Sequence, residues 1–352
     1  MNLKEIVAPL LQWYDRNART LAWRDDPSPY RVWLSEIMLQ QTRVEAAKPY
    51  YDRFLERLPT IASLAEASED TILKLWEGLG YYNRVRNMQK AARIVMQEYG
   101  GQLPREFDQL LKLPGIGVYS AGAIASIAYQ TKVPAVDGNV LRVISRIQAS
   151  FDNISNPAVI KAMSRQLQEI LPERVGDFNQ SLMELGAMVC LPNGQPKCEE
   201  CPVKVLCQGY QKGVMNQLPV KEAPQKRKKE KKTLLLLICG DRVALSKRPE
   251  KGLLAKMWEY PQQEGHLTKA ECLDLLKKQG FSVSSIQSAG STKHIFTHIE
   301  WQMKGFLVQV NEMPEDYRWA TWQEISEQCA IPSAFLKFTV VLEQQLRGEK
   351  HA

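Results

Sequence analysis

Four of the seven cysteines in this sequence of 352 residues lie in one short segment. Their spacing is C-x7-C-x2-C-x5-C, and the other three cysteines are scattered through the C-terminal third. Four thiolates that converge on one point suit a metal centre with sulfur ligands, either a 4Fe–4S cluster or a zinc ion. Zinc sites usually pair two C-x2-C elements across a longer gap, so a single C-x2-C favours one 4Fe–4S cluster per chain. Its ligands would be Cys190, Cys198, Cys201 and Cys207.

A disulfide framework is a weaker interpretation of these cysteines, because nothing marks the chain as secreted. No apolar signal-peptide core follows a basic start, and no apolar run is long enough to span a membrane. We therefore expect a cytoplasmic protein with no membrane partner, and we expect it to be a monomer.

Charge is unevenly distributed and divides the chain. The formal net charge is +7, and residues 221–232 hold six Lys and one Arg against two Glu. This stretch is either a solvated linker or a basic strap that runs near a phosphate backbone, and the two interpretations are compatible. We expect a mainly α region over residues 1–215, a basic linker over 216–232 and an α+β domain over 233–346.

Capping residues mark several helix starts. Asn2 followed by Glu5, and Thr268 followed by Glu271, have the spacing of a capping box. Pro9 inside the first apolar pattern predicts a kink or a late start of that helix. After the linker, the apolar run at 233–239 predicts a strand.

Two glycines separate two helical segments at Leu113–Gly117. A turn with Gly115 and Gly117 lets the backbone approach another surface closely, and the helix that opens at Val118 offers free N–H groups to an anion. Such a helix–hairpin–helix unit grips a DNA phosphate. The alternative is a tight helix–helix connection without a ligand.

Asp137 lies twenty residues beyond Gly117 and precedes another helical segment. At a helix N-cap its carboxylate is stabilised as the anion. A plain capping aspartate is one interpretation. A carboxylate with a low pKa is also what an oxocarbenium-like transition state needs beside it.

The glycine hairpin, the aspartate-opened helix and the four cysteines, in this order, resemble the helix–hairpin–helix base-excision glycosylases. Endonuclease III and the MutY-type adenine DNA glycosylases share this layout, which covers about residues 1–215. The resemblance implies a six-helix barrel with the hairpin over about 22–131, and an iron–sulfur domain built from 1–21 and 132–215. It also implies a bacterial-type protein associated with the nucleoid.

The resemblance assigns the chemistry to two carboxylates. Lyase members carry a lysine at the position of Tyr119, and a phenol cannot form a Schiff base. Glu36, in an otherwise apolar helix, lies in the family's E-x-x-L-Q-Q-T motif; the alternative is a partly exposed surface glutamate. Burial would keep Glu36 protonated as a general acid, while Asp137 stabilises the cation and Tyr119 and Asn139 position it.

Further roles follow from the same resemblance. The adenine pocket would be lined by Trp23, Arg24, Leu39, Gln180 and Glu184. In the family, several side chains wedge into the duplex around the opposite base. The matching residues in this chain are Gln41, Thr42, Leu79 and Tyr81. Tyr81 also suits an ordinary core position.

The family's first cysteine interval is usually six residues, and this chain has seven, in a loop rich in Pro, Asn and Gly. In the last third, residues 252–261 and 294–302 resemble the MutY-type C-terminal domain, which has a Nudix-like fold. The metal-binding glutamates of a Nudix hydrolase are missing after Pro261. The family recognises 8-oxoguanine with this domain, and its loop corresponds here to Phe296, Thr297 and His298, with Thr297 replacing serine.

The resemblance therefore predicts a monofunctional adenine glycosylase that acts on duplex DNA containing A opposite 8-oxoguanine or G. A related glycosylase for damaged pyrimidines is the nearest alternative, and Tyr119 and the third domain argue against it. A non-catalytic iron–sulfur DNA-binding protein is another, and the retention of both Glu36 and Asp137 argues against that.

Overall fold

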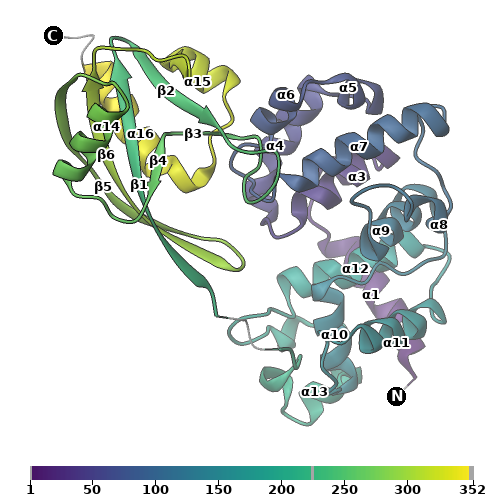
Figure 1. Ribbon diagram of the computed structural model, residues 1–352. Helices are drawn as coiled ribbons and strands as arrows, with labels where there is room; N and C mark the ends of the chain where they lie inside the picture. The colour runs from purple at the N-terminus through teal and green to yellow at the C-terminus, as the bar shows by residue number, and fades with distance from the viewer. Residues whose placement is uncertain (1, 223–225, 349–352) are drawn as a thin grey trace. The chain divides into compact units, whose positions relative to one another are not determined.

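The computed structural model describes residues 2–222 and 226–348 (Figure 1). By their contacts, these residues form two compact units. The first contains the described parts of 1–66 and 87–223, and the second contains those of 67–86 and 224–352. Within the described residues, no helix is both long and apolar enough to cross a membrane.

The first unit is helical, as expected. The chain begins with a 3-10 turn, Leu3–Ile6, and α1 starts only at Val7, so Pro9 lies in the first helical turn where its missing N–H is tolerated. The late start is confirmed. Asn2 Oδ1 accepts from the N–H of Lys4 rather than Glu5, so the capping box is not formed here.

The other helices of the first unit are α2 (Ala22–Asp25), α3 (Pro29–Leu39), α4 (Val44–Arg57), α5 (Ile61–Glu66), α7 (Asn83–Glu98, whose first turn belongs to the second unit), α8 (Phe107–Leu110), α9 (Val118–Tyr129), α10 (Gly138–Gln148), α11 (Pro157–Gln168), α12 (Val175–Met188) and α13 (Gln208–Gln211). Three 3-10 turns surround the cysteines and the segment after them, at Cys198–Glu200, Lys204–Leu206 and Met215–Gln217.

One apolar core joins the N-terminus to the cysteine segment. Leu10 of α1 packs in the same cluster as Ile144 of α10, Leu182 of α12 and Val203 between the cysteines. Because these residues are far apart in sequence, they hold the two ends of this unit together.

Two helices of the first unit are buried almost all round. In α3 every residue from Val32 to Met38 is buried, and in α9 every residue from Ser120 to Ile127 is buried. A helix that is apolar on all faces lies inside a protein. These two helices pack against each other and carry two of the expected catalytic residues.

The segment 67–86 was expected within the helical barrel but groups with the C-terminal residues. It contains α6 (Glu69–Leu75), whose N-cap Ser68 accepts from the N–H of Thr71. Lys74 Nζ donates to the carbonyl oxygens of Ile325 and Cys329 at 3.2 and 3.1 Å. These long-range bonds, which no local pattern encodes, account for the difference.

The second unit is an α+β fold around a mixed sheet with the strand order β3-β2-β1-β6-β5. Strands β1 and β6 run parallel, and the other pairs are antiparallel. Its strands are β1 (Lys228–Cys239), β2 (Arg242–Lys247), β3 (Trp258–Glu259), β4 (Gln262–Glu264), β5 (Val283–Ile295), β6 (Ile299–Val310) and β7 (Arg318–Thr321). Its further helices are α14 (Lys269–Lys278), α15 (Trp322–Gln328), the 3-10 turn Ser333–Phe335 and α16 (Leu336–Gly348).

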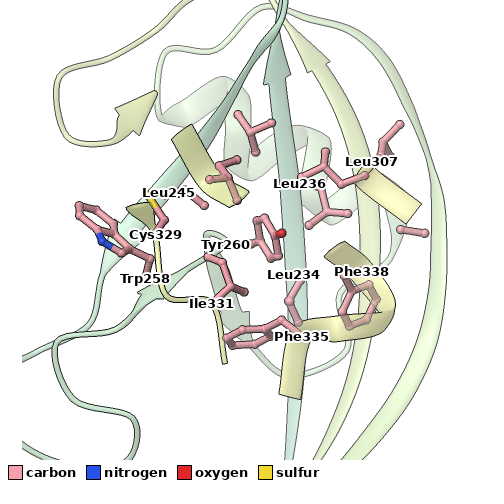
Figure 2. Packing of buried hydrophobic residues seen from close by; sticks show 14 of the residues in the cluster. Leu234, Leu236, Leu245, Trp258, Tyr260, Leu307, Cys329, Ile331, Phe335 and Phe338 are labelled. Carbon is pink, nitrogen blue, oxygen red and sulfur yellow. The ribbon is translucent and has the colours of Figure 1, made fainter. Parts of the chain in front are cut away.

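The central strand β1 supplies both faces of the sheet. Leu234 and Leu236 join the cluster that includes Phe335 and Phe338, whereas Leu235 and Leu237 join the cluster on α14. Figure 2 shows the first cluster, with Tyr260 between the strand and the C-terminal helices. Since side chains alternate along a strand, a continuous apolar run is what a strand covered on both faces requires.

Two expectations for this region have different outcomes. The capping box of Thr268 and Glu271 opens α14 as expected. Strand β1 begins at Lys228, so residues 228–232 are strand and not linker; they pair with Ile299–Met303 of β6. Of the remaining linker, residues 223–225 lie outside the described residues.

Candidate active site and cysteine cavity

Glu36 is buried in α3, where every residue from Val32 to Met38 is buried. Pro29 opens this helix after Ser28, and Glu36 is 7% exposed. Burial raises the pKa of Glu36 to about 7, and the negative charge of Asp137 adds to the shift. Glu36 is therefore a buried carboxyl group and not a surface glutamate, and its raised pKa favours the protonated form.

Tyr119, in the first turn of α9, contacts Glu36. Its hydroxyl donates a hydrogen bond to Glu36 Oε2 and lies 3.6 Å from the sulfur of Met183. Burial keeps the pKa of Tyr119 well above its ordinary value, so the phenol stays a donor. The resemblance implied that Tyr119 positions Asp137; the structure gives Glu36 as its hydrogen-bond partner, because α3 and α9 pack directly together.

Asp137 is the N-cap of α10. Its Oδ1 accepts from the backbone N–H of Val140 at 2.7 Å, and its Oδ2 accepts from Asn139 Nδ2 at 2.7 Å. Burial nonetheless raises the pKa of Asp137, although these hydrogen bonds and Arg142 oppose the shift. The predicted low pKa is thus wrong, because the sequence shows the cap but not the depth of burial.

Glu184, near the end of α12, is held by two arginines. It accepts from Arg19 through the backbone N–H, Nε and Nη2, and from Arg24 through Nη1 and Nη2. Arg24 Nε also donates to Gln180 Oε1 at 3.1 Å. Burial alone would raise the pKa of Glu184, but these bonds outweigh it and hold the pKa at about 2.

The structure thus joins three expected pocket residues, Arg24, Gln180 and Glu184, into one network. Arg19 was missed by the sequence analysis. Its partner Glu184 is 165 residues away, and no local pattern signals such a contact. Of the other expected pocket residues, Trp23 is buried in an edge-to-face contact with Tyr51, and Leu39 is half-buried at the end of α3.

The sequence analysis also missed two buried arginines of α10, Arg142 and Arg146. Arg142 donates to Asn139 Oδ1, to the carbonyl of Gly186 and to the carbonyl of Cys190, at 2.8, 2.8 and 2.9 Å. Since Asn139 bonds Asp137, a continuous chain of hydrogen bonds runs from the backbone of a cysteine to the candidate catalytic aspartate. Arginines rarely sit on an apolar helix face unless they are paired, which is the one sequence signal that was available.

The four clustered cysteines line one cavity. Its wall also contains apolar residues of α10 and α12 and the side chain of Arg146. Arg146 Nη1 donates to Cys190 Sγ at 3.3 Å, and the carbonyl of Arg146 accepts from Cys207 Sγ at 3.4 Å. All seven cysteines are free.

The four cysteine thiols are the donors that a metal centre would use here. Burial raises the pKa of Cys201 to about 12, so a bound cation is needed to turn this thiol into a thiolate ligand. No three His, Cys, Asp or Glu side chains in residues 2–222 and 226–348 converge enough to hold one ion. The chemistry of the donor set, four thiols around one cavity, fits a sulfur-ligated metal centre.

The two hairpin glycines have different structural roles. Gly115 has φ +79°, and an added Cβ would lie 2.7 Å from Asn87 Cβ, so this position requires glycine. Gly117 is the N-cap of α9, where nothing lies within 4 Å of an added Cβ. The open backbone at Gly117 leaves the first N–H groups of α9 accessible to an anion.

The expected wedge residues differ in accessibility. Gln41 is exposed and has φ +62°, and Thr42 beside it is half-buried. In the second unit, Tyr81 is 50% exposed with φ +48°, whereas Leu79 is only 8% exposed. Left-handed backbone at a non-glycine residue costs free energy and clusters at functional sites. Leu79 is therefore a packing residue here, because its side chain is enclosed.

The hairpin between β5 and β6 presents the expected recognition loop. Thr297 and His298 are exposed, and Phe296 packs edge-to-face on Trp301 with centroids 4.9 Å apart. The hydroxyl groups of Thr297 and Tyr81 lie 3.2 Å apart, within hydrogen-bond distance. Two expected DNA-reading residues from distant parts of the sequence thus meet in one unit.

Comparisons with known proteins agree with this geometry. Residues 34–172 match the family model described as HhH-GPD superfamily base excision DNA repair protein, and residues 233–339 match the NUDIX domain. A solved thermostable thymine-DNA glycosylase is similar with a TM-score of 0.55 and 31% identity, over 59% of this chain and 96% of that chain. An endonuclease III–DNA complex, at a TM-score of 0.51 and 22% identity over 61% of this chain and 99% of that chain, shares the fold.

Relatives named adenine DNA glycosylase are similar over most of the chain. The protein from Mus musculus is 35% identical over 97% of this chain and 78% of its own length. The protein from Buchnera aphidicola subsp. Baizongia pistaciae is 34% identical over 86% of each chain. With such relatives over most of its length, the chain belongs to the adenine DNA glycosylase family of the helix–hairpin–helix base-excision superfamily.

Proposed function

We propose that this glycosylase removes adenine paired with 8-oxoguanine, or with guanine, in duplex DNA. The observation that carries the proposal is the buried Glu36, which the hydroxyl of Tyr119 contacts and whose pKa of about 7 suits a general acid at neutral pH. The target nucleotide must leave the stack, since its glycosidic bond is unreachable within the duplex.

The reaction uses the two carboxyl groups in different protonation states. Glu36 donates its proton to the adenine ring at N7, so the C1′–N9 bond breaks with its electron pair going to the base. Asp137, as the carboxylate held by Asn139 and Val140, stabilises the positive charge that develops at C1′. A water oxygen then bonds to C1′, and its proton passes to the carboxylate of Glu36.

The products are free adenine and an intact strand with an abasic site. Tyr119 has no amine with which to form a Schiff base, so the chain has no nucleophile at the position that lyase members use. Tyr119 orients the carboxyl group of Glu36, and the network of Arg24, Gln180 and Glu184 lines the proposed adenine pocket.

Selection of the opposite base is assigned to the β5–β6 hairpin. The exposed hydroxyl of Thr297 donates to or accepts from the opposite purine, and Tyr81 stacks beside it. The four cysteines would hold a 4Fe–4S cluster, which supplies a rigid cross-link that fixes their loop next to α10.

The deciding experiment is single-turnover base release from duplexes with A opposite 8-oxoguanine, G or T, together with thymine-glycol and G:T duplexes. We expect fast adenine release opposite 8-oxoguanine, slower release opposite G, and strand breaks only after alkali. The Asp137→Asn variant should bind the first duplex but release no adenine on the same timescale. Release of thymine or thymine glycol with spontaneous strand cleavage would instead place the chain with pyrimidine-specific enzymes.

A further inference from the structure

The Tyr81 turn, residues 77–81, lies between α6 and α7 and has an unusual backbone. Gly78, Gly80 and Tyr81 all have positive φ, of +102°, +70° and +48°. A tyrosine in the left-handed region costs free energy, so the surrounding structure must hold it there. The side chain of Tyr81 is 50% exposed, so burial of the ring in a core does not supply that support.

Arg84, in the first turn of α7, holds the backbone of the Tyr81 turn. Its Nη2 donates to the carbonyl oxygens of Leu79 and Gly80, both at 3.2 Å. Trp76 Nε1 donates to the same Gly80 carbonyl at 3.1 Å. Two side chains thus converge on the peptide group that precedes Tyr81, and together they fix its orientation.

The guanidinium group of Arg84 also contacts two aromatic rings. Its Cζ lies 5.4 Å from the centroid of the Trp76 ring and 5.6 Å from the centroid of the Tyr81 ring. Trp76 is fully buried, so Arg84 connects the exposed tyrosine to a fixed ring. Burial lowers the pKa of Arg84 to about 10, and the group is therefore a partly desolvated cation at neutral pH. Cation–π contacts are stronger when the cation is desolvated.

The hydroxyl end of Tyr81 is placed beside the β5–β6 hairpin. Its Oη lies 3.2 Å from Thr297 Oγ1, and all of these residues belong to the second unit. The position of Tyr81 is thus set at three points, which are its backbone, its ring and its hydroxyl. Arg84 contributes to the first two.

We propose that Arg84 is a positioning residue that holds the Tyr81 ring in the orientation in which it inserts beside the opposite purine. The inference rests on the proposed function, because it takes Tyr81 as a wedge residue. Arg84 acts through Tyr81 and binds no phosphate itself. A wedge that is held in place before binding loses less conformational entropy on insertion. Lysine cannot replace Arg84, because one ammonium group lacks the planar fork that bonds two carbonyl oxygens while it contacts two rings.

The first test measures binding to a duplex with a tetrahydrofuran abasic analogue opposite 8-oxoguanine. For Arg84→Lys we expect the Kd to rise about five- to tenfold, through loss of the ring contacts and of one hydrogen bond. Arg93 is the matched control, since it lies on the same helix and donates to the carbonyl of Ala65 at 3.0 Å, but belongs to the first unit. Arg93→Lys should leave the Kd unchanged. An unchanged Kd for Arg84→Lys would overturn the proposal.

The second test is a double-mutant cycle with Tyr81→Ala. If Arg84 acts through the tyrosine, Arg84→Lys should change the Kd less than about twofold in the Tyr81→Ala background. The same loss in both backgrounds would contradict the proposal. A loss of folded protein would weaken binding in both backgrounds alike, so it cannot imitate the expected coupling.

A neutral variant separates positioning from direct contact with the DNA. Arg84→Gln removes the charge and should leave the slope of log Kd against log salt as it is in wild type. A slope lower by about one would mean that Arg84 neutralises a phosphate, which contradicts the proposal.

A fluorescent base reports the insertion of the wedge. 2-Aminopurine next to the opposite purine becomes brighter when a side chain unstacks it. At saturating enzyme, wild type should raise this fluorescence and Arg84→Lys should raise it clearly less; equal signals would overturn the proposal. Since all of these duplexes carry the uncleavable analogue, a failure of the proposed adenine excision, seen as no base release by wild type, remains distinguishable.

Discussion

At the scale of single residues, the proposed chemistry depends on one carboxyl group, that of Glu36, whose burial disfavours ionisation. Glu36 lies among buried residues of α3, and the same burial that raises its pKa to about 7 makes it an acid at neutral pH. Its partner Tyr119 contributes a hydrogen bond that partly offsets this shift. The effect of burial on the pKa and the opposing effect of the hydrogen bond can be measured separately.

The pH dependence of base release should report the ionisation of Glu36. Below pH 7 the acid is protonated and the rate of the chemical step should be nearly constant; above pH 7 the rate should fall about tenfold per pH unit. Single-turnover rates between pH 5.5 and 9 measure this. In Glu36→Gln the rate should be lower by a factor of about 100 or more, and its remaining pH dependence should lack the step near pH 7.

The buried carboxyl group of Glu36 should destabilise the folded protein once it ionises, at neutral and alkaline pH. The folded-state pKa of Glu36 is above its usual value of 4.5, so the folded state binds the proton more tightly than the unfolded state. Stability is therefore lost as pH rises from about 4.5 to 7. Glu36→Gln should raise the free energy of unfolding by about 1–3 kcal/mol at pH 8 and change it little at pH 4.5, as urea titrations will show. Equal effects at both pH values would disprove this origin.

At the scale of elements, the close packing of α10 on α12 positions the aspartate. An added Cβ at Gly186 of α12 would lie 2.7 Å from Asn139 Cβ and 3.2 Å from Arg142 Nη2. The Gly186 carbonyl accepts from Arg142, which also holds Asn139. Glycine at this position therefore lets the two helices approach closely enough to hold Asn139 beside Asp137, the proposed catalytic carboxylate.

We expect Gly186→Ala to separate the two helices. It should lower the free energy of unfolding by about 1–3 kcal/mol and reduce base release, because Asn139 loses its position beside Asp137. Urea titration and single-turnover kinetics test this. The matched control is Gly138→Ala at the start of α10, where an added Cβ meets nothing within 4 Å; it should not destabilise the fold.

The β5–β6 hairpin is the second element with a specific prediction. Thr297→Val keeps the shape of the side chain but removes the hydroxyl that lies 3.2 Å from Tyr81 Oη. We expect the ratio of release rates from A:8-oxoguanine over A:G to fall about three- to tenfold. Thr297→Ser keeps the hydroxyl and should preserve the ratio. If Val and Ser behave alike, the methyl group and not the hydroxyl matters at this position.

At the scale of the whole molecule, the first unit is closed by residues from both ends of its sequence. Leu10 near the N-terminus, Ile144 of α10 and Val203 of the cysteine segment share one core. Cys190 and Cys201 pack against this core, and Cys207 belongs to it. A centre bound by the four thiols would therefore add to the stability of the unit that carries Asp137.

Loss of one thiol should release the proposed cluster. Cys201→Ser, purified anaerobically, should contain much less iron and sulfide than wild type and lower the Tm by about 5 °C or more. The control Cys239→Ser, at the end of β1 in the second unit, should keep full iron and sulfide content. Stoichiometric zinc in the wild-type protein would contradict the iron–sulfur assignment.

The sequence by itself determined the features that depend on neighbours along the chain. The cysteine spacing, the aspartate cap of α10, the hairpin glycines and the change from helical to strand patterns at residue 233, after the basic linker, are all local signals. The family motifs added Glu36 and Tyr119 to the candidate site. The fold class and the family assignment are confirmed on this basis.

Only the tertiary structure decided the properties that depend on burial and on distant partners. It showed that the pKa of Asp137 is raised, that Tyr119 bonds Glu36, and that Leu79 is enclosed. It also paired Arg19 with Glu184 across 165 positions. Desolvation and long-range hydrogen bonds arise when separate segments pack together, and no pattern within one segment records which segments those will be.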